Sequence, residues 1–306
     1  MSRGKGFGLD LMDTIHNEGI VHTRLIEKIE NETKRTLVCY TSFFAHPAGT
    51  IDNQADPEVL ENILKSVDLD RYKGKLDLLI HSPGGSPTAA ERIILTCRGY
   101  SSAFRVIVPR TAMSAATLVA MGADTIFMSA TSELGPIDPQ MIQQLPGGQA
   151  IMRPASAYLN AYLSLINNAQ NAILGRQPPH PYIELLRQQD PSWIQVCLQA
   201  RNLSRTIAQQ CLSSHMLKGK PEEEIVKVVE NFLQEGEQSA HGRAIRAPKA
   251  KEYGLVIEQA DNKGDLWKAI WEMYLRCTDY VQRKKVAKYW LSRNGGVDVH
   301  FARLQV

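Results

Sequence analysis

Short apolar segments alternate with helical segments along the first half of the chain. Four runs rich in Val, Ile, Leu and Phe have the length of buried strands, at residues 35–42, 76–80, 104–109 and 125–128. Three helical patterns lie between them, at residues 56–67, 88–100 and 114–122. Strands and helices in turn, joined by short links, predict an α/β fold with a parallel sheet that helices cover on both faces.

The pattern changes after Ser129 and suggests how the rest of the chain is organised. We expect an N-terminal helical arm at residues 1–34 and a main domain at 35–258 that carries a helical insertion at 153–234. Residues 259–306 should form a helical C-terminal extension, with helical spacing over 263–293 and a tail that adds an edge strand.

Composition excludes several classes of protein. A net charge of +3 over 306 residues gives no general attraction to nucleic acid. The five cysteines lack zinc-site spacing and are expected to be reduced, buried thiols, so we predict no metal site. No apolar run resembles a signal peptide or a membrane span, which favours the cytoplasm. No G-x-G-x-x-G follows a strand, so we predict no cofactor.

Two short motifs follow successive predicted strands. Gly84 and Gly85 lie in HSPGGSP, where the backbone can turn N–H groups toward a bound carbonyl oxygen, as an oxyanion hole requires. Ser114 lies in AMSAAT at the start of a predicted helix, among small residues that leave room for a substrate backbone. A Gly-Gly turn or an N-cap serine is ordinary alone. Both motifs fall on the carboxyl edge of the sheet, where ligands bind, and together they predict an active site.

The same segments carry a family resemblance. HSPGGSPTAAERI (81–93), VPRTAMSAATLVAMGADTIFMS (108–129) and ELGPIDPQ (133–140) resemble the serine dehydrogenase proteinase family of the Clp peptidase/crotonase superfamily, relatives of signal peptide peptidase A. The resemblance implies a Clp/crotonase-like sheet built from repeated β-α units. It also implies a nucleophile at Ser114, oxyanion donors at Gly84 and Gly85, and triad partners at Asp138 in GPIDPQ and His241 in HGRAI.

The function predicted from these motifs is a serine endopeptidase that cleaves unfolded or membrane-released polypeptides. Its expected partners are the polypeptide substrate, further copies of the chain in a homo-oligomer and an activating protein. A Ser–Lys dyad is an alternative mechanism, although the lysines that follow Ser114 lie in polar surroundings, at Lys218, Lys220, Lys249 and Lys251. Two alternative functions stay open: a degenerate peptidase that acts as a scaffold or sensor, and a crotonase-like acyl-CoA hydrolase or hydratase.

Other residues are expected to be structural. His81 should pack at the end of its strand, and Trp267, Trp271 and Tyr274 have the helical spacing of a core or a subunit contact. The basic run at residues 283–285, together with Lys288, should be a solvated helix face.

Overall fold

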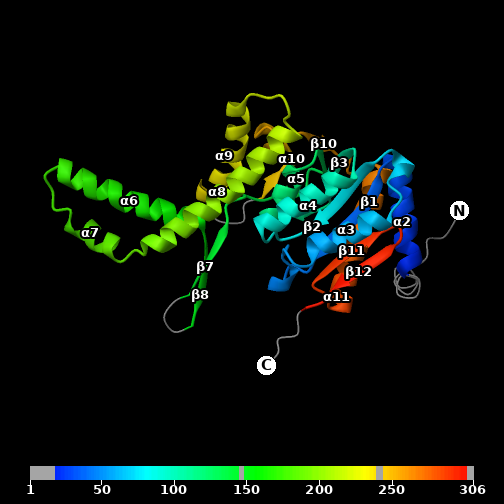
Figure 1. Cartoon of the computed structure of the whole chain (residues 1–306), viewed down its shortest axis with the longest axis horizontal. Coiled ribbons are helices and arrows are strands. Elements are labelled where there is room, and N and C mark those ends of the chain that lie inside the picture. Colours follow the sequence, from blue (N-terminus) through cyan, green and yellow to red (C-terminus); the bar gives the residue numbers. More distant parts are fainter. Residues whose placement is uncertain (1–17, 145–147, 239–243, 302–306) are drawn as a thin grey trace. The chain divides into compact units, whose positions relative to one another are not determined.

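The computed structural model describes residues 18–144, 148–238 and 244–301. The chain divides into two compact units, which are described separately: unit 1 comprises residues up to Leu134 and from Ile245 onward, and unit 2 comprises Gly135–Ala244. Both are shown in Figure 1. The unit boundaries differ from the predicted helical insertion at 153–234, because a β-hairpin precedes the helices of unit 2.

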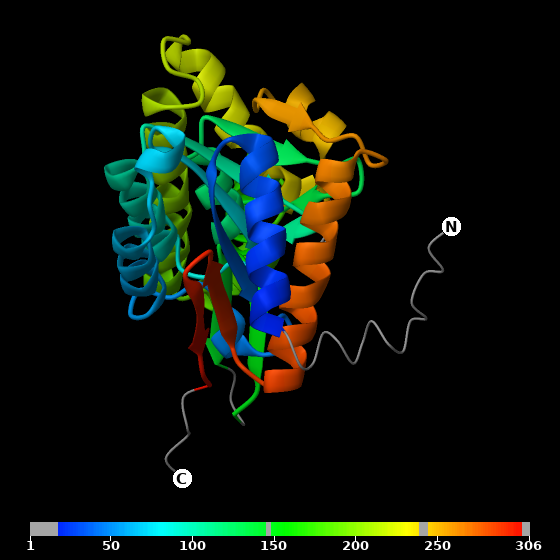
Figure 2. The same cartoon turned by 90° about the vertical axis from the view of Figure 1, so that its right-hand side faces the viewer.

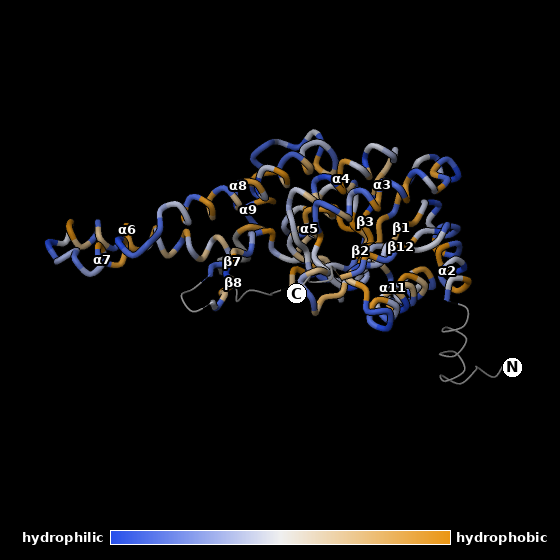
Figure 3. The backbone as a smooth tube through the Cα atoms, turned by 60° about the horizontal axis from the view of Figure 1, so that its bottom comes forward, coloured by the Kyte–Doolittle hydropathy of each residue, from blue (hydrophilic) through white to orange (hydrophobic). Residues whose placement is uncertain are grey.

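The main sheet of unit 1 has seven strands in the described part of the chain, in the order β10-β5-β3-β2-β1-β11-β12. Five strands pair in parallel: β1 (Thr36–Ser42), β2 (Lys75–His81), β3 (Ala103–Val108), β5 (Thr125–Met128) and β10 (Ile257–Gln259). Hydrophobic residues concentrate along these central strands (Figure 3). The predicted fold class, a mostly parallel sheet built from β-α units, is confirmed.

Helices cover both faces of this sheet. On one face α2 (Glu18–Thr33) and α11 (Asp265–Lys284) lie side by side, as Figure 2 shows, and bury Ile26, Ile29 and Ile270 against the strands. The other face carries α3 (Asp56–Ser66), α4 (Pro87–Tyr100) and α5 (Ala115–Met121). The segment predicted as an N-terminal arm therefore contributes α2 to the core of unit 1.

Smaller elements complete unit 1. Short strands form a second sheet in the order β4-β6-β9, at Thr111–Ala112, Glu133–Leu134 and Ile245–Arg246. A helix, α10 (Ala247–Glu252), and two 3-10 turns, η1 (Pro47–Gly49) and η2 (Asp70–Tyr72), lie between the larger elements.

Unit 2 consists of a hairpin followed by helices. The hairpin pairs β7 (Gln140–Gln144) with β8 (Ala150–Pro154), and the helices are α6 (Ala155–Leu174), α7 (His180–Arg187), α8 (Pro191–Ser214) and α9 (Glu222–Gln238). Within the described ranges of both units, each helix is too short or too polar to cross a membrane. All five cysteines are free and buried, as predicted.

The helical prediction for residues 263–293 is wrong at its end. Helix α11 ends at Lys284, where Lys285 adopts a left-handed conformation, and Lys288–Ser292 form β11, antiparallel to β1. The sequence KYWLS has the aromatic and apolar content of a strand. The tail then adds the predicted edge strand as β12 (Gly295–Val299).

Lys288 is also not on a solvated face. Its side chain is fully buried and its Nζ lies 2.7 Å from Oδ2 of Asp56, with Asp52 as a second carboxylate partner. The indole of Trp290 donates to the other oxygen of Asp56 at 3.2 Å. A buried lysine needs such partners, because an unpaired charge in the interior is costly.

His22 on α2 generates a prediction about pH. Its imidazole is 2% exposed and packs near the rings of Tyr280 and Tyr289, and its Nε2 has no hydrogen-bond partner among the described residues. Burial, aided by nearby arginines, lowers the pKa of His22 to about 4. Below pH 6.5 His22 becomes protonated in the unfolded chain, whereas in the folded chain it stays neutral until the pH falls to about 4. The free energy of unfolding should therefore fall by about 1.4 kcal/mol per pH unit from this group across that window.

The His22→Phe variant keeps a ring in place and removes the titration. Urea unfolding at several values between pH 7 and pH 4 should show a shallower loss of stability than in the parent chain. His300→Gln is the control, because His300 is exposed and stays in water in both states. Equal slopes for His22→Phe and the parent chain would contradict the prediction.

Candidate active site

The two motifs singled out in the sequence meet at the carboxyl edge of the main sheet. Ser82 follows β2, and Thr111 begins the short strand that follows β3. The N–H of Ser82 donates to the carbonyl of Thr111 at 3.1 Å, and the N–H of Met113 donates to the carbonyl of Ser82 at 3.0 Å. We call residues 82–86 the glycine loop and residues 111–115 the serine turn. The two hydrogen bonds hold these segments together, as the sequence predicted from their shared edge of the sheet.

Ser114 has an unusual backbone. Its φ of 49° and ψ of −115° lie outside the left-handed helical region that Lys73 and Lys285 occupy at their helix ends. It lies at the turn from β4 to α5, and its carbonyl accepts from the N–H of Leu118 at 3.1 Å. Such strain costs about 1–3 kcal/mol and is typical of functional sites, including the strand-to-helix turn that presents a nucleophilic serine.

The hydroxyl of Ser114 does not cap its helix. Although Ser114 is the N-cap residue of α5, its side chain makes no capping hydrogen bond, and the residue is half-buried. The interpretation of this serine as a simple N-cap is therefore wrong.

Gly84 packs directly against the serine turn. Its φ is 100°, and a Cβ at this position would lie 2.5 Å from the carbonyl oxygen of Met113 and 2.8 Å from Cβ of Ser114. Both the conformation and the space therefore require glycine here. The close approach positions the backbone at Gly84 beside the Cβ atom of Ser114 and the backbone N of Ala115.

Backbone hydrogen bonds orient the glycine loop. The carbonyl of Gly84 accepts from the N–H of Ile51 at 2.7 Å, and the N–H of Ser86 donates to the carbonyl of Ile51 at 2.9 Å. The N–H of Gly84 donates to Oγ of Ser82 at 3.1 Å. Among the described residues, the N–H groups of Gly85 and of Ala115, the residue after the serine, donate no backbone hydrogen bond. Both N–H groups are therefore candidate donors to a bound ligand.

The structure describes one of the two predicted triad partners of Ser114. Asp138 belongs to unit 2 and is 2% exposed; its Oδ2 accepts from the N–H and the hydroxyl of Ser156, at 3.2 and 2.5 Å. Nε of Arg201 lies 3.8 Å from Oδ1. His241 falls outside the described residues. The assembly of Ser114, Asp138 and His241 therefore stays a prediction.

The four lysines weighed for a Ser–Lys dyad are exposed, as expected. Lys249 pairs with Glu252 at 2.8 Å and Lys220 with Glu224 at 3.3 Å. A lysine that serves as a catalytic base is typically buried, and these four are exposed to solvent. No group of three possible metal-ligating side chains occurs within the described ranges.

Sequence comparison identifies the family of this region. Residues 49–157 match the model of the ClpP-like SDH-type serine proteinases, which confirms the family predicted from the motifs over a segment that contains Gly84, Gly85, Ser114 and Asp138. Two uncharacterized proteins of Methanocaldococcus jannaschii are similar in sequence. One is 30% identical over 201 residues, which are 65% of this chain and 58% of that protein. The other is 37% identical over 102 residues, which are 33% of this chain and 32% of that protein.

The chain thus spans less than two thirds of the length of either relative. Among solved structures, a mutant of the 1510-N membrane-bound stomatin-specific protease is similar with a TM-score of 0.40 and 15% sequence identity. That similarity covers 72% of this chain and 79% of the other.

The close approach of Gly84 predicts the effect of one methyl group. Gly84→Ala should destabilise unit 1 by about 1–3 kcal/mol, because the added Cβ meets backbone atoms and the φ of 100° strains any other residue. Urea unfolding measures this loss. Gly99→Ala on α4 is the matched control, since no atom lies within 4 Å of its added Cβ, and alanine should stabilise that helix by up to about 1 kcal/mol. A Gly84→Ala variant as stable as the parent would show that the loop is not so constrained.

Proposed function

Because residues 49–157 match the ClpP-like SDH-type serine proteinases, we propose that this chain is a serine endopeptidase that hydrolyses peptide bonds of unfolded or membrane-released polypeptides. The observation that carries the proposal is the strained backbone of Ser114 with Gly84 packed against it. A strained serine turn beside a glycine loop with unused N–H groups fits acyl transfer.

In the proposed reaction the substrate carbonyl oxygen lies against the N–H groups of Gly85 and Ala115. Oγ of Ser114 attacks the carbonyl carbon and gives its proton to a base, and the two N–H groups stabilise the oxyanion that forms. Collapse of this intermediate transfers the proton to the leaving amine and leaves an acyl-enzyme. Water then attacks the ester in the same way, releases the acid product and restores the serine. Loss of one oxyanion donor typically costs about 3–4 kcal/mol of barrier.

The geometry of the glycine loop supports a refinement of the predicted oxyanion hole. Gly84 and Gly85 were both expected to donate. Because the N–H of Gly84 already donates to Oγ of Ser82, Gly84 serves in our proposal to allow the close approach to Ser114. Gly85 then supplies the donor from the loop, and Ala115 supplies the second.

His241 is the proposed general base, with Asp138 as the residue that orients it. Asp138 is buried, accepts a hydrogen bond from the hydroxyl of Ser156 and lies near Arg201, contacts that hold its carboxyl group in one orientation. An ionised carboxylate can stabilise the imidazolium that forms when the base takes the serine proton.

The proposal includes a cytoplasmic homo-oligomer, which an additional protein could activate. Several large apolar side chains on the helices of unit 2 are exposed, as subunit contacts require: Leu163, Ile173, Leu174, Leu185 and Val196. We place the contacts between copies on these helices.

A fluorophosphonate probe tests the nucleophile. The parent chain should gain one adduct, measured as intact mass, and Ser114→Ala should gain none, because an activated serine attacks the phosphorus as it would a carbonyl carbon. The exposed Ser213 on α8 provides a control variant, Ser213→Ala, which should label like the parent. No labelling of either chain, with an unfolded substrate such as casein present, would favour the scaffold function. Saturable binding of coenzyme A would favour the acyl-CoA function.

The base is tested by the rate of labelling against pH. His241→Ala and Asp138→Asn should each slow the reaction of Ser114 by about a hundredfold or more at pH 7 and flatten its dependence on pH, because the serine loses its proton acceptor. Lys249→Ala and Lys220→Ala should react like the parent. If instead a lysine variant loses reactivity and His241→Ala keeps it, the dyad mechanism holds and the triad does not.

A further inference from the structure

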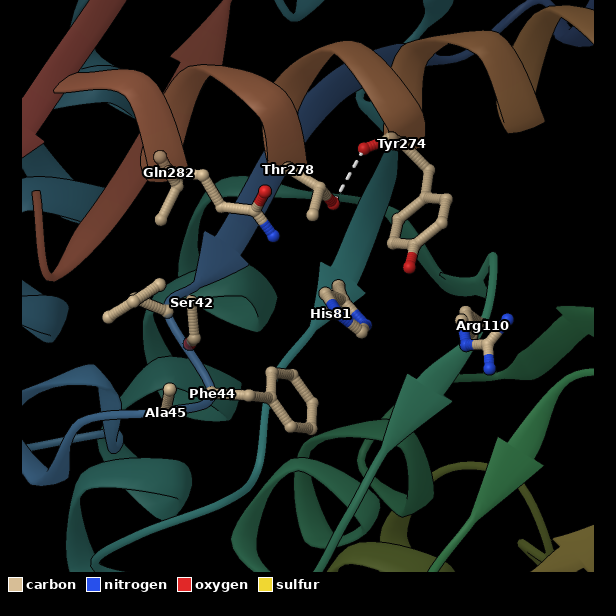
Figure 4. A pocket seen from close by; sticks show the side chains of 10 residues that line it. Ser42, Phe44, Ala45, His81, Arg110, Tyr274, Thr278 and Gln282 are labelled. Atoms are coloured by element: carbon tan, nitrogen blue, oxygen red, sulfur yellow. Dashed lines mark hydrogen bonds between the residues drawn. The ribbon is translucent and has the colours of Figure 1, made fainter. Parts of the chain in front are cut away.

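A pocket opens on the other face of the sheet edge that carries the candidate active site. It has a volume of 310 Å³ and lies in unit 1, where α11 passes over the ends of the strands (Figure 4). Ser42 and His81 are the last residues of β1 and β2, and Arg110 follows β3. In open parallel sheets such an edge is the usual place for ligands.

This pocket is separate from the serine turn. Successive residues of a strand point to opposite faces of a sheet. His81 faces α11 and packs on Tyr274, whereas the next residue, Ser82, bonds to Gly84 on the side of Ser114. A ligand in the pocket would therefore contact neither Ser114 nor the glycine loop.

Aromatic rings form much of the wall. The ring of Phe44 stacks on His81 with centroids 4.4 Å apart, and Tyr274 meets His81 edge-on at 4.8 Å. Phe44 is 42% exposed although it is large and apolar. The three rings offer flat surfaces on which a planar or aromatic group of a ligand can pack.

The charge in the pocket is positive. None of its ten lining residues is acidic, and Arg110 forms no ion pair with a carboxylate among the described residues. In Figure 4 the guanidinium of Arg110 lies to the right of His81 and below Tyr274, and the nitrogen atoms of His81 are on the side of its ring that faces Arg110. The amide of Gln282 adds a donor and an acceptor on α11. One exposed guanidinium without a carboxylate partner suits a ligand with a single negative charge.

His81 adds an acceptor. Burial lowers its pKa to about 4, so the imidazole is neutral at pH 7. Its Nδ1 lies 3.2 Å from the carbonyl oxygen of Thr111, so in the neutral ring Nδ1–H donates to that carbonyl and Nε2 can accept a hydrogen bond from a ligand. The pocket therefore combines a cation, an acceptor and aromatic walls.

We propose that this pocket binds a small ligand that carries a carboxylate, an adjacent N–H or O–H and an aromatic or planar side group. The carboxylate pairs with Arg110, the N–H or O–H donates to His81, and the planar group packs against the ring of Phe44 or of Tyr274, both of which contact His81. A free aromatic acid and the C-terminus of a peptide share this chemistry. The proposal does not depend on peptidase activity.

N-acetylphenylalanine is the probe, and its uncharged amide is the control ligand. Isothermal titration with the full chain should show saturable binding of the acid in the micromolar to millimolar range and much weaker binding of the amide. Arg110→Gln should weaken binding of the acid by about three- to tenfold, and Arg110→Lys should retain most of it. The matched control is Arg24→Gln on α2, also exposed, which should bind like the parent.

A variant that fills the pocket provides an independent test. Thr278 lines the pocket, and its hydroxyl donates to the carbonyl of Tyr274 in its own helix, so Thr278→Leu adds bulk without removing a hydrogen bond to another element. This variant should lose binding of the acid while its melting temperature stays close to that of the parent. A tripeptide ending in phenylalanine identifies the source of the carboxylate: tighter binding than the acetylated amino acid supports a peptide C-terminus, and weaker binding supports a free acid.

The proposal is overturned if the acid does not bind saturably, if the amide binds as well as the acid, or if Arg110→Gln and Thr278→Leu both bind like the parent. These results would leave the fluorophosphonate reaction of Ser114 unaffected, because the two sites lie on opposite faces of the strand ends.

Discussion

The contact between Gly84 and the backbone of residues 113–115 is the constraint on which the candidate active site depends. This contact leaves no room for a Cβ atom at Gly84, because such an atom would lie 2.5 Å from the carbonyl oxygen of Met113. It also brings two β-α connections, about thirty residues apart in sequence, into direct contact. Ser82 secures this contact through its backbone, which bonds to Thr111 and Met113, and through its hydroxyl, which holds the N–H of Gly84. The strain at Ser114 persists because these bonds fix the residues around it.

The glycine loop is in turn supported by the C-terminal hairpin. Ile51 pairs with the loop on both sides of Gly85, and the next residue, Asp52, shares Lys288 with Asp56. Burial raises the pKa of Asp56, and Lys288 opposes that rise. Breaking such a buried pair typically costs about 3–5 kcal/mol, because one charge is left without a partner. The segment beside the glycine loop is thus anchored to β11 through a charge that cannot move without a large loss of stability.

The sequence predicted the parts of the fold that local patterns determine. The strands β1, β2, β3 and β5 are short apolar runs between helical patterns, and their ends fix where Ser82 and Thr111 lie. The meeting of Gly84 and Ser114 followed from the rule that parallel strands end at one edge. The motifs alone could not show which N–H groups remain available, because the bond from Gly84 to Ser82 depends on the conformation of the loop.

Long-range pairing accounts for what the sequence could not predict. Lys288 follows a basic run on a helix, and its partner Asp56 lies 232 residues earlier in the chain. Its burial depends on β11 pairing with β1, which local periodicity does not reveal. The contacts of Asp138 with Ser156 and Arg201 are equally invisible in GPIDPQ, where the Asp before proline reads as a turn residue.

The alternation of side chains along β2 gives the sheet edge two faces. His81 closes an aromatic pocket under α11, and Ser82, its neighbour, holds the glycine loop beside Ser114. The N–H of Ser82 and the Nδ1 atom of His81 both contact the carbonyl of Thr111, which begins the serine turn. A ligand that moved His81 would therefore act on an atom that the serine turn also uses. Two faces with different chemistry thus share one carbonyl group in addition to the peptide bond that joins His81 to Ser82.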